Sequence, residues 1–294
     1  MRDSRFVCSL TLSFGGIHEN VRVLVGRNHA GCLLDRSPAV IQTIWRISRQ
    51  LVEENTDGDS HQRGHRRRGY NKIYVIGGST GDLNDHRLNQ EYDIATDIWR
   101  NRAPLPRGLN HAAATSLNRK IYVVGAFTAA GHGGAVNLVY EYDPATDSWR
   151  TLAPLKNPRG SVGVTVLNGK IHAIGGRGVD NVTVTTHEVF DPASGKWTEL
   201  APLPRARDHL AVVAANGRIY AIGGRLGETP QMVDQHDIYN PATNTWQAGA
   251  PLPTPRSGIA GALYQDKIFV AGGECRDRKT YPEFEAYDPK ISDD

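Results

Sequence analysis

Short apolar runs that end in glycine recur at a regular interval along most of this chain. They are KIYVIGG from Lys72, KIYVVG from Lys120, KIHAIGG from Lys170, RIYAIGG from Arg218 and KIFVAGG from Lys267. The isoleucines of successive runs are 48, 50, 48 and 49 residues apart. A period of about 50 residues is typical of propeller arrays, in which each repeat forms one small sheet that must stack against its neighbours. The pattern therefore predicts a repeat scaffold.

Each repeat divides into four short β-compatible stretches separated by turn residues. In the second repeat these are residues 110–117, 120–125, 138–143 and 148–152. In the second to fifth copies the first stretch is rich in small residues, which suits the narrow innermost strand of a wedge-shaped blade. The second stretch is apolar at consecutive positions, as in a strand covered on both faces. Each repeat is therefore predicted to form a four-stranded antiparallel blade.

Glycine pairs and tryptophans mark the same phase in successive repeats. A glycine pair lets the chain leave the second strand with positive φ and pass close to other backbone. These pairs are Gly77 and Gly78, Gly175 and Gly176, Gly223 and Gly224, and Gly272 and Gly273. Each of four tryptophans lies 22 residues before the isoleucine of the next repeat, which predicts packing between neighbouring sheets. They are Trp99, Trp149, Trp197 and Trp246.

The succession of a glycine pair, a turn of the type Tyr-Asp-Pro and a tryptophan resembles the Kelch repeat. The resemblance covers about residues 70–294, and it is specific because three motifs recur in register. It implies an all-β fold, a Kelch-type β-propeller with five recognisable blades. It does not imply one function, because Kelch propellers include protein-binding platforms, sialic-acid mutarotases, copper oxidases and iron-dependent specifier proteins.

Both ends of the repeat array look incomplete in the sequence. The last repeat stops where its tryptophan is due, and the first lacks a small-residue strand before Lys72. We expect residues 1–69 to form a separate N-terminal region, with a short amphipathic helix over 38–54 and a basic linker over 55–69. The β-like stretch at residues 21–25 is a candidate for the missing strand.

Charge and composition favour an ordinary globular chain. Residues 1–70 carry eleven lysines and arginines against seven acidic residues, and the remainder carries 23 against 24, so the weak basicity is local. No aromatic residues interleave with the arginines of the linker, so a nucleic-acid partner is not expected. No apolar run is long enough for a membrane span. We expect a cytoplasmic location, with a secreted or periplasmic one left open, and the sequence does not indicate the oligomeric state.

The sequence offers little support for an enzyme. The three cysteines, Cys8, Cys32 and Cys275, are scattered and suggest neither a disulfide framework nor a metal cluster. The ligand sets of the Kelch-type copper oxidases and iron specifier proteins are not recognisable either. No cofactor is therefore predicted, although activity on a sugar acid, resembling that of the mutarotases, remains an alternative.

Positions that vary between repeats indicate where a ligand would bind. The residue that opens the first strand is Leu109, Arg159, Arg207 or Arg256, and two residues later the chain carries His111, Ser161, His209 or Gly258. By resemblance, these positions and the loops after the glycine pairs surround the mouth of the central channel. The candidate ligand-binding residues are Arg159, Arg207, Arg256, His111, His209, Arg177 and Arg225.

Two interpretations of the arginines remain open. They either stay solvated at the mouth and bind carboxylates, or pair with carboxylates of the blades, since an arginine fork suits both roles. We expect a binding platform that recognises an acidic peptide or protein, or an acidic small molecule, at the channel mouth. The alternatives are the mutarotase-like enzyme and a structural or truncated fragment without a binding function.

Overall fold

The computed structural model describes residues 7–14, 17–24, 51–54, 72–78, 86–129, 132–227, 231–273 and 284–289. The chain divides into two compact units, Met1–Ser37 and Pro38–Asp294. In the first unit, β1 (Val7–Phe14) and β2 (Ile17–Leu24) form an antiparallel hairpin. The β-like stretch from residue 21 belongs to this hairpin as far as residue 24, so it does not supply the strand missing from the first blade; residue 25 lies outside the described residues.

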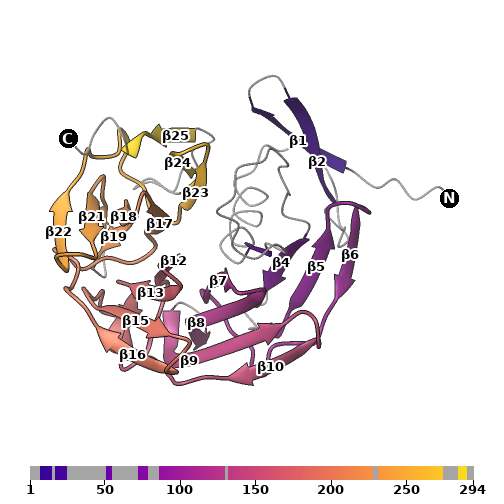
Figure 1. The fold of residues 1–294 in the computed structure, drawn as a ribbon, viewed down its shortest axis with the longest axis horizontal. Coiled ribbons are helices and arrows are strands. Elements are labelled where there is room, and N and C mark those ends of the chain that lie inside the picture. Colours follow the sequence, from indigo (N-terminus) through magenta and orange to yellow (C-terminus); the bar gives the residue numbers. More distant parts are fainter. Residues whose placement is uncertain are drawn as a thin grey trace. The chain divides into compact units, whose positions relative to one another are not determined.

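Five antiparallel sheets of three or four strands follow one another around a common centre in the second unit (Figure 1). The first is β3 (Leu51–Glu54), β4 (Lys72–Ile76), β5 (Asn89–Asp93) and β6 (Ile98–Asn101). The second is β7 (Ala113–Leu117), β8 (Lys120–Ala129), β9 (Gly133–Asp143) and β10 (Ser148–Thr151). The third is β12 (Gly163–Leu167), β13 (Lys170–Ile174), β15 (His187–Asp191) and β16 (Lys196–Glu199). The fourth is β17 (Ala211–Ala215), β18 (Arg218–Ile222), β21 (His236–Asn240) and β22 (Thr245–Ala248), and the fifth has β23 (Ala260–Tyr264), β24 (Lys267–Ala271) and β25 (Phe284–Tyr287). Two short two-stranded sheets accompany these five sheets, β11 (Arg159–Gly160) with β14 (Arg177–Gly178) and β19 (Arg225–Leu226) with β20 (Gln231–Met232).

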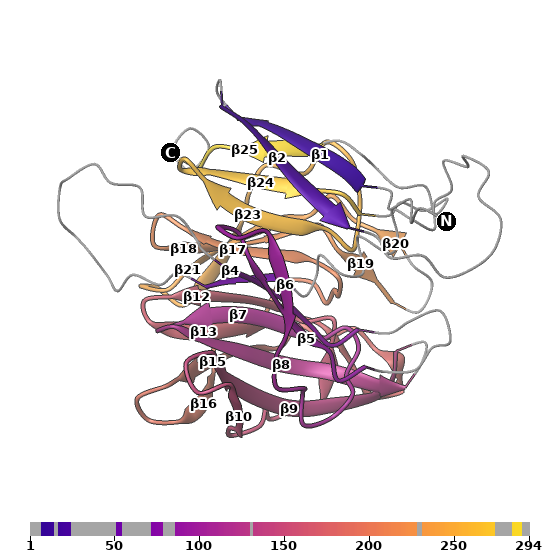
Figure 2. The same cartoon turned by 90° about the vertical axis from the view of Figure 1, so that its right-hand side faces the viewer.

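The first strands of successive blades lie side by side at the centre. Strand β7 packs between β3 and β12, and β17 packs between β12 and β23. Figure 2 shows the strands β7, β8 and β9 of the second blade running alongside one another. The predicted five-bladed β-propeller is therefore confirmed. Among the described residues, no helix is long and apolar enough to cross a membrane.

The innermost strand of the first blade corrects two expectations. Strand β3 pairs antiparallel with β4, with Leu51 opposite Val75, so the blade includes residues well before 70. These four residues were expected to end a helix over 38–54, and that prediction is wrong for them; residues 38–50 lie outside the described part. Strand β4 otherwise has an open edge, and pairing with β3 satisfies its backbone groups.

Tight turns join the first and second strands of blades two to five. Their two central residues both have positive φ, as in Asn168 (50°) with Gly169 (71°) and Asn216 (47°) with Gly217 (73°). This is the type I′ geometry, whose twist matches that of the flanking strands. The expected positive φ is also found at every glycine of the four pairs. At Gly175 a side chain would be excluded, because a Cβ there would lie 2.5 Å from the carbonyl oxygen of Arg207 in the next blade.

The hydrophobic core lies between blades rather than in one central mass. One cluster joins Ile76 of the first blade to Ile121 and Val123 of the second, and three further clusters join the later pairs of neighbouring blades. This arrangement explains why the repeats must stack, since a single sheet cannot cover both of its faces.

The tryptophans connect neighbouring blades as the sequence predicts. The indole Nε1 of Trp149 donates a hydrogen bond of 2.8 Å to the carbonyl of Ala103, which follows the outer strand of the preceding blade. Trp197 and Trp246 make the same 2.8 Å bond one and two blades further on. All three are partly buried, whereas Trp99 of the first blade is 39% exposed.

Candidate functional site

A chain of backbone hydrogen bonds links the innermost positions of four blades. The amide of Ser161 donates to the carbonyl of His111 (3.0 Å), that of His209 to Ser161 (3.2 Å), and that of Gly258 to His209 (2.8 Å). All four residues have positive φ, between 47° and 70°. Three are not glycine, and such a conformation in a larger residue is strained unless the surroundings enforce it. This column, which the sequence placed at the mouth of the central channel, therefore forms a rigid arc.

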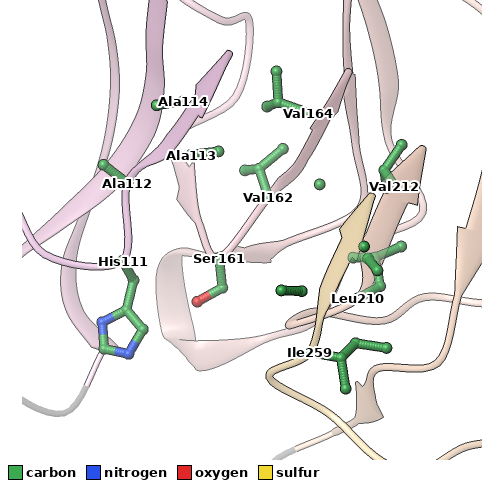
Figure 3. Close-up of a pocket in the computed structure, with 14 residues that line it drawn as sticks. His111, Ala112, Ala113, Ala114, Ser161, Val162, Val164, Leu210, Val212 and Ile259 are labelled. Carbon is green, nitrogen blue, oxygen red and sulfur yellow. The ribbon is translucent and has the colours of Figure 1, made fainter. Parts of the chain in front are cut away.

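A cavity of about 160 Å³ adjoins this arc, between the innermost strands. Most of the residues that line it are small or aliphatic, and Figure 3 shows Ala112, Val162, Leu210 and Ile259 around the same space, with His111 and Ser161 also lining it. The small side chains that narrow the inner strands thus also leave room at the centre. Polar atoms nevertheless make up most of the surface exposed to the cavity, so it offers hydrogen bonds as well as apolar contacts.

The arginine that opens the first strand of blades three to five is buried. Arg159, Arg207 and Arg256 are at most 1% exposed. Arg159 pairs with Glu188, Arg207 with Asp237 at 2.6 Å, and Arg256 with Glu285. Burial lowers the pKa of the Arg159 and Arg207 guanidinium groups, and the paired carboxylates oppose that shift.

The expectation that these three guanidinium groups remain solvated at the mouth is therefore corrected. Each carboxylate partner stands on the third strand of the same blade, at equivalent positions of β15, β21 and β25. In the second blade the arginine is replaced by Leu109 and the carboxylate position by Tyr140, and both of these side chains are buried. Arginine and carboxylate are thus present or absent together, as expected for a pair that fills the interior of a blade.

Arg177 and Arg225, from the loops after the glycine pairs, share one buried carboxylate. Both guanidinium Nε atoms contact Asp208, Arg225 at 3.0 Å. Arg177 also donates to the carbonyl of Gly227 in the next blade at 2.7 Å, so it ties two blades together. Burial raises the pKa of the Asp208 carboxyl, but His209, Arg225 and Arg177 outweigh burial and hold that pKa well below its ordinary value. Asp208 therefore carries one negative charge between two arginines.

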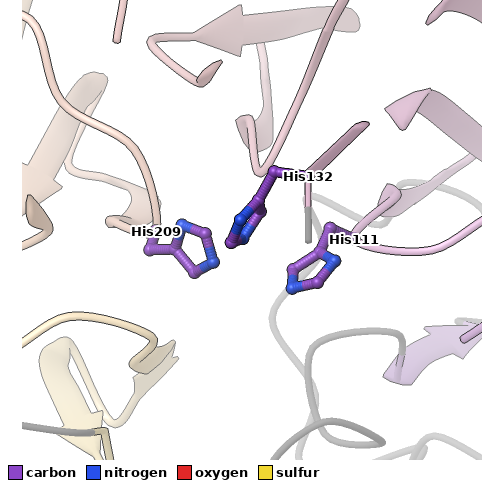
Figure 4. A group of neighbouring side chains, drawn as sticks. All are labelled: His111, His132 and His209. Carbon is purple, nitrogen blue, oxygen red and sulfur yellow. The ribbon is translucent and has the colours of Figure 1, made fainter. Parts of the chain in front are cut away.

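Three histidines meet beside Arg225. One ring nitrogen from each of His111, His132 and His209 lies within 4.8 Å of the others, and Figure 4 shows the three imidazoles facing one another. Arg225 Nη2 lies 3.0 Å from His132 Nε2 and 3.3 Å from His209 Nε2. Because a guanidinium can only donate, both of these nitrogens face Arg225 as acceptors.

Neighbouring side chains orient two of these rings. His111 Nδ1 lies 2.6 Å from Asn110 Oδ1, and His209 Nδ1 lies 3.0 Å from Asp208 Oδ1. The third, His132, stands in the connection between β8 and β9. We refer to His111, His132, His209, Arg225 and Asp208 as the mouth cluster. Among the described residues, these three histidines are the group whose geometry could hold a metal ion.

The sequence identified His111, His209 and Arg225 of this cluster by position, and it did not identify His132 or Asp208 as site residues. The loops after the glycine pairs were expected at the mouth, and His132 lies in the corresponding connection of the second repeat, between β8 and β9, but no recurring residue marks it. Of the candidate ligand-binding residues, His111, His209, Arg177 and Arg225 gather at this end of the channel. The other three form the buried pairs described above.

Fold and cluster together define a repeat β-propeller with a polar, arginine- and histidine-bearing group at the end of its central cavity. The model of the KLHDC2/KLHL20/DRC7 Kelch-repeats domain matches residues 42–224, and the Kelch motif matches residues 206–253. The chain belongs to the Kelch-repeat family. It is also similar to the human Kelch repeat and BTB domain-containing protein 12, with 34% identity over 62 residues. That match covers 20% of this chain and about a tenth of the relative's length.

Proposed function

We propose that this chain is a protein-binding domain that recognises an acidic segment of its partner at the mouth cluster. Kelch propellers commonly mediate protein binding, and the family match covers more than half of the chain. The acidic character of the partner is inferred from the cluster itself. The buried arginine column takes no part in the proposal.

The observation that carries the proposal is the gathering of cationic side chains at the mouth cluster. The guanidinium groups of Arg177 and Arg225 both contact the single carboxylate of Asp208. The Arg225 side chain is 12% exposed, against 3% for Arg177, so it is the more accessible of the two. A carboxylate arriving at Arg225 gains charge-assisted hydrogen bonds to a group already held in place.

The family, rather than the cavity, favours a peptide over a sugar acid, since Kelch propellers commonly mediate protein binding. Alanine, valine, leucine and isoleucine line much of the cavity, but polar atoms make up most of the surface exposed to it. The cavity can therefore offer hydrogen bonds as well as apolar contacts to the segment that binds beside it.

Binding of an acetylated oligoglutamate peptide, measured by fluorescence anisotropy, tests the proposal, with oligoglutamine as the neutral control. The full chain should bind the acidic peptide alone, and more weakly as NaCl rises from about 50 mM to about 500 mM. Arg225→Gln should weaken binding about tenfold, because a charged hydrogen bond contributes about 1.5 kcal/mol or more. The matched control is Arg205→Gln, which removes the same charge from an exposed arginine outside the mouth cluster.

Equal binding of the two peptides would overturn the proposal, as would unchanged binding by a folded Arg225→Gln variant. Failure of the peptide combined with binding or anomerisation of a sialic acid would favour the carbohydrate alternative instead.

A further inference from the structure

We propose that His111, His132 and His209 form a binding site for a divalent late first-row transition metal such as Zn²⁺. Three imidazoles are the typical protein ligands of a zinc ion that keeps a fourth position for water or another donor. Mg²⁺ and Ca²⁺ fit poorly, since both require mainly oxygen ligands. This inference does not depend on the acidic partner proposed above.

The first argument is the convergence of the rings from separate parts of the fold. His111 and His209 stand at equivalent positions of the second and fourth blades, with φ of 47° and 57°, and His132 comes from a hairpin connection. Their ring centroids are 4.6 to 5.4 Å apart. The backbone hydrogen bonds through Ser161 fix His111 and His209 relative to each other. The site is therefore built on the rigid arc rather than on a surface loop alone.

The second argument concerns the groups behind the ligands. Histidines that bind metals usually donate their other N–H to a carboxylate or carbonyl oxygen, which fixes the tautomer and strengthens the ligand nitrogen. Here Asn110 Oδ1 lies 2.6 Å from His111 Nδ1, and Asp208 Oδ1 lies 3.0 Å from His209 Nδ1. The contact with Asn110 leaves Nε2 of His111 as the coordinating atom, and the Asp208 carboxylate beside His209 adds a negative charge close to the ion.

The third argument is that a cation already occupies this place. Arg225 Nη2 accepts no hydrogen bonds, and it lies 3.0 Å from His132 Nε2 and 3.3 Å from His209 Nε2. Two imidazole lone pairs are thus directed at one positively charged group. A zinc ion would take over these lone pairs, with the Arg225 guanidinium displaced from them.

Only a small adjustment is needed for coordination. Zinc–nitrogen bonds of about 2.0–2.1 Å place tetrahedral nitrogens about 3.3 Å apart, and the three nitrogens here lie within 4.8 Å. Rotation of the imidazoles about the broad second side-chain torsion supplies a shift of this size. The backbone arc does not have to move.

Isothermal titration of the EDTA-treated full chain with ZnCl₂ tests the site, because His132→Ala leaves every histidine outside the cluster unchanged. Wild type should bind one more equivalent than His132→Ala, and His86→Ala, a half-buried histidine outside the cluster, should match wild type. Arg225→Gln should bind zinc on the order of tenfold more tightly, because like charges at this spacing repel. Co²⁺ in place of zinc should give the visible absorption of a nitrogen-coordinated tetrahedral ion, lost in His132→Ala.

Equal zinc stoichiometry of wild type and His132→Ala would overturn the site. An unchanged affinity in Arg225→Gln would overturn the claim that the guanidinium stands in the metal's place. The same variant is expected to weaken the acidic peptide and to strengthen zinc, so failure of one proposal is distinguishable from failure of the other.

Discussion

The buried pair of Arg159 and Glu188 offers a stringent test of how a blade is held together. Both side chains have 0% exposure, and the guanidinium also donates to the carbonyls of Gly175 at 3.1 Å and Asn157 at 3.2 Å. The carboxylate accepts the backbone N–H of Lys156 at 2.9 Å. Removal of either partner therefore leaves a full charge buried with only neutral partners.

We expect Glu188→Tyr and Arg159→Leu each to lower the free energy of unfolding by about 3–5 kcal/mol. For a chain of this size, such a loss lowers the melting temperature by about 10 °C. The double variant Arg159→Leu/Glu188→Tyr installs the two residues that the second blade carries at these positions. It should recover to within about 2 kcal/mol of wild type, since replacing a buried ion pair by apolar groups is often close to neutral.

The assay is urea denaturation of the wild type, the two single variants and the double variant, analysed as a double-mutant cycle. A positive coupling energy of several kcal/mol is expected. Near wild-type stability of Arg159→Leu would show that the guanidinium is solvated after all. A double variant destabilised by the sum of the single losses would show that the second blade is not a valid template for the third.

Three further predictions concern stability. Burial lowers the pKa of His172 to about 4, below the ordinary value of about 6.5. As the pH falls, His172 is therefore protonated in the unfolded chain before it is protonated in the folded protein. The free energy of unfolding should accordingly fall as the pH drops from about 6.5 to about 4. Three other blades carry tyrosine at this position, and His172→Tyr should remove about 3 kcal/mol of this loss of stability, measured by urea denaturation at both pH values. An unchanged dependence of stability on pH would contradict this prediction. Trp149→Phe removes the hydrogen bond to the preceding blade and should lower the free energy of unfolding, measured by urea denaturation, by about 1 kcal/mol. A free energy of unfolding equal to that of wild type within error would show that this bond does not stabilise the fold. Gly175→Ala should lower the free energy of unfolding by about 1–3 kcal/mol, because φ is +62° and the new Cβ would meet the carbonyl of Arg207. Gly195 has a similar φ but open space around it, so Gly195→Ala should cost less. Equal losses of stability in the two variants would exclude the contact with Arg207 as the cause.

Features set by the repeat itself could be predicted from the sequence. The phase of the blades, the positive φ of the glycine pairs and the inter-blade role of Trp149 follow from residues that recur at one interval. Strand β3 could not be placed in this way. A four-residue stretch of two apolar and two acidic residues fits a helix or a strand equally well, and only its pairing with β4 decides between them.

The candidate site was located by position but not by environment. The sequence placed Arg159 and Arg207 correctly at the opening of the first strand, yet their carboxylate partners lie 29 and 30 residues further along the chain. Periodicity reports which residues are equivalent, not which of them point inward. His132 lies in the connection between the second and third strands, and the other repeats carry no histidine at an equivalent place that a column could reveal.

Contacts within a blade and contacts between blades involve different groups, and this difference affects how a repeat array can evolve. Ion pairs between side chains, such as Arg159 with Glu188, mostly stay within one blade, whereas contacts across blades mostly end on backbone, as where Trp197 donates to the carbonyl of Ala153. A backbone carbonyl is present whatever side chain accompanies it. A gene segment encoding one blade could therefore be duplicated or exchanged without matched substitutions in its neighbours. The ion pair of Arg177 and Asp208 joins side chains of two blades, so recombination at that junction would lose a buried contact and destabilise the fold.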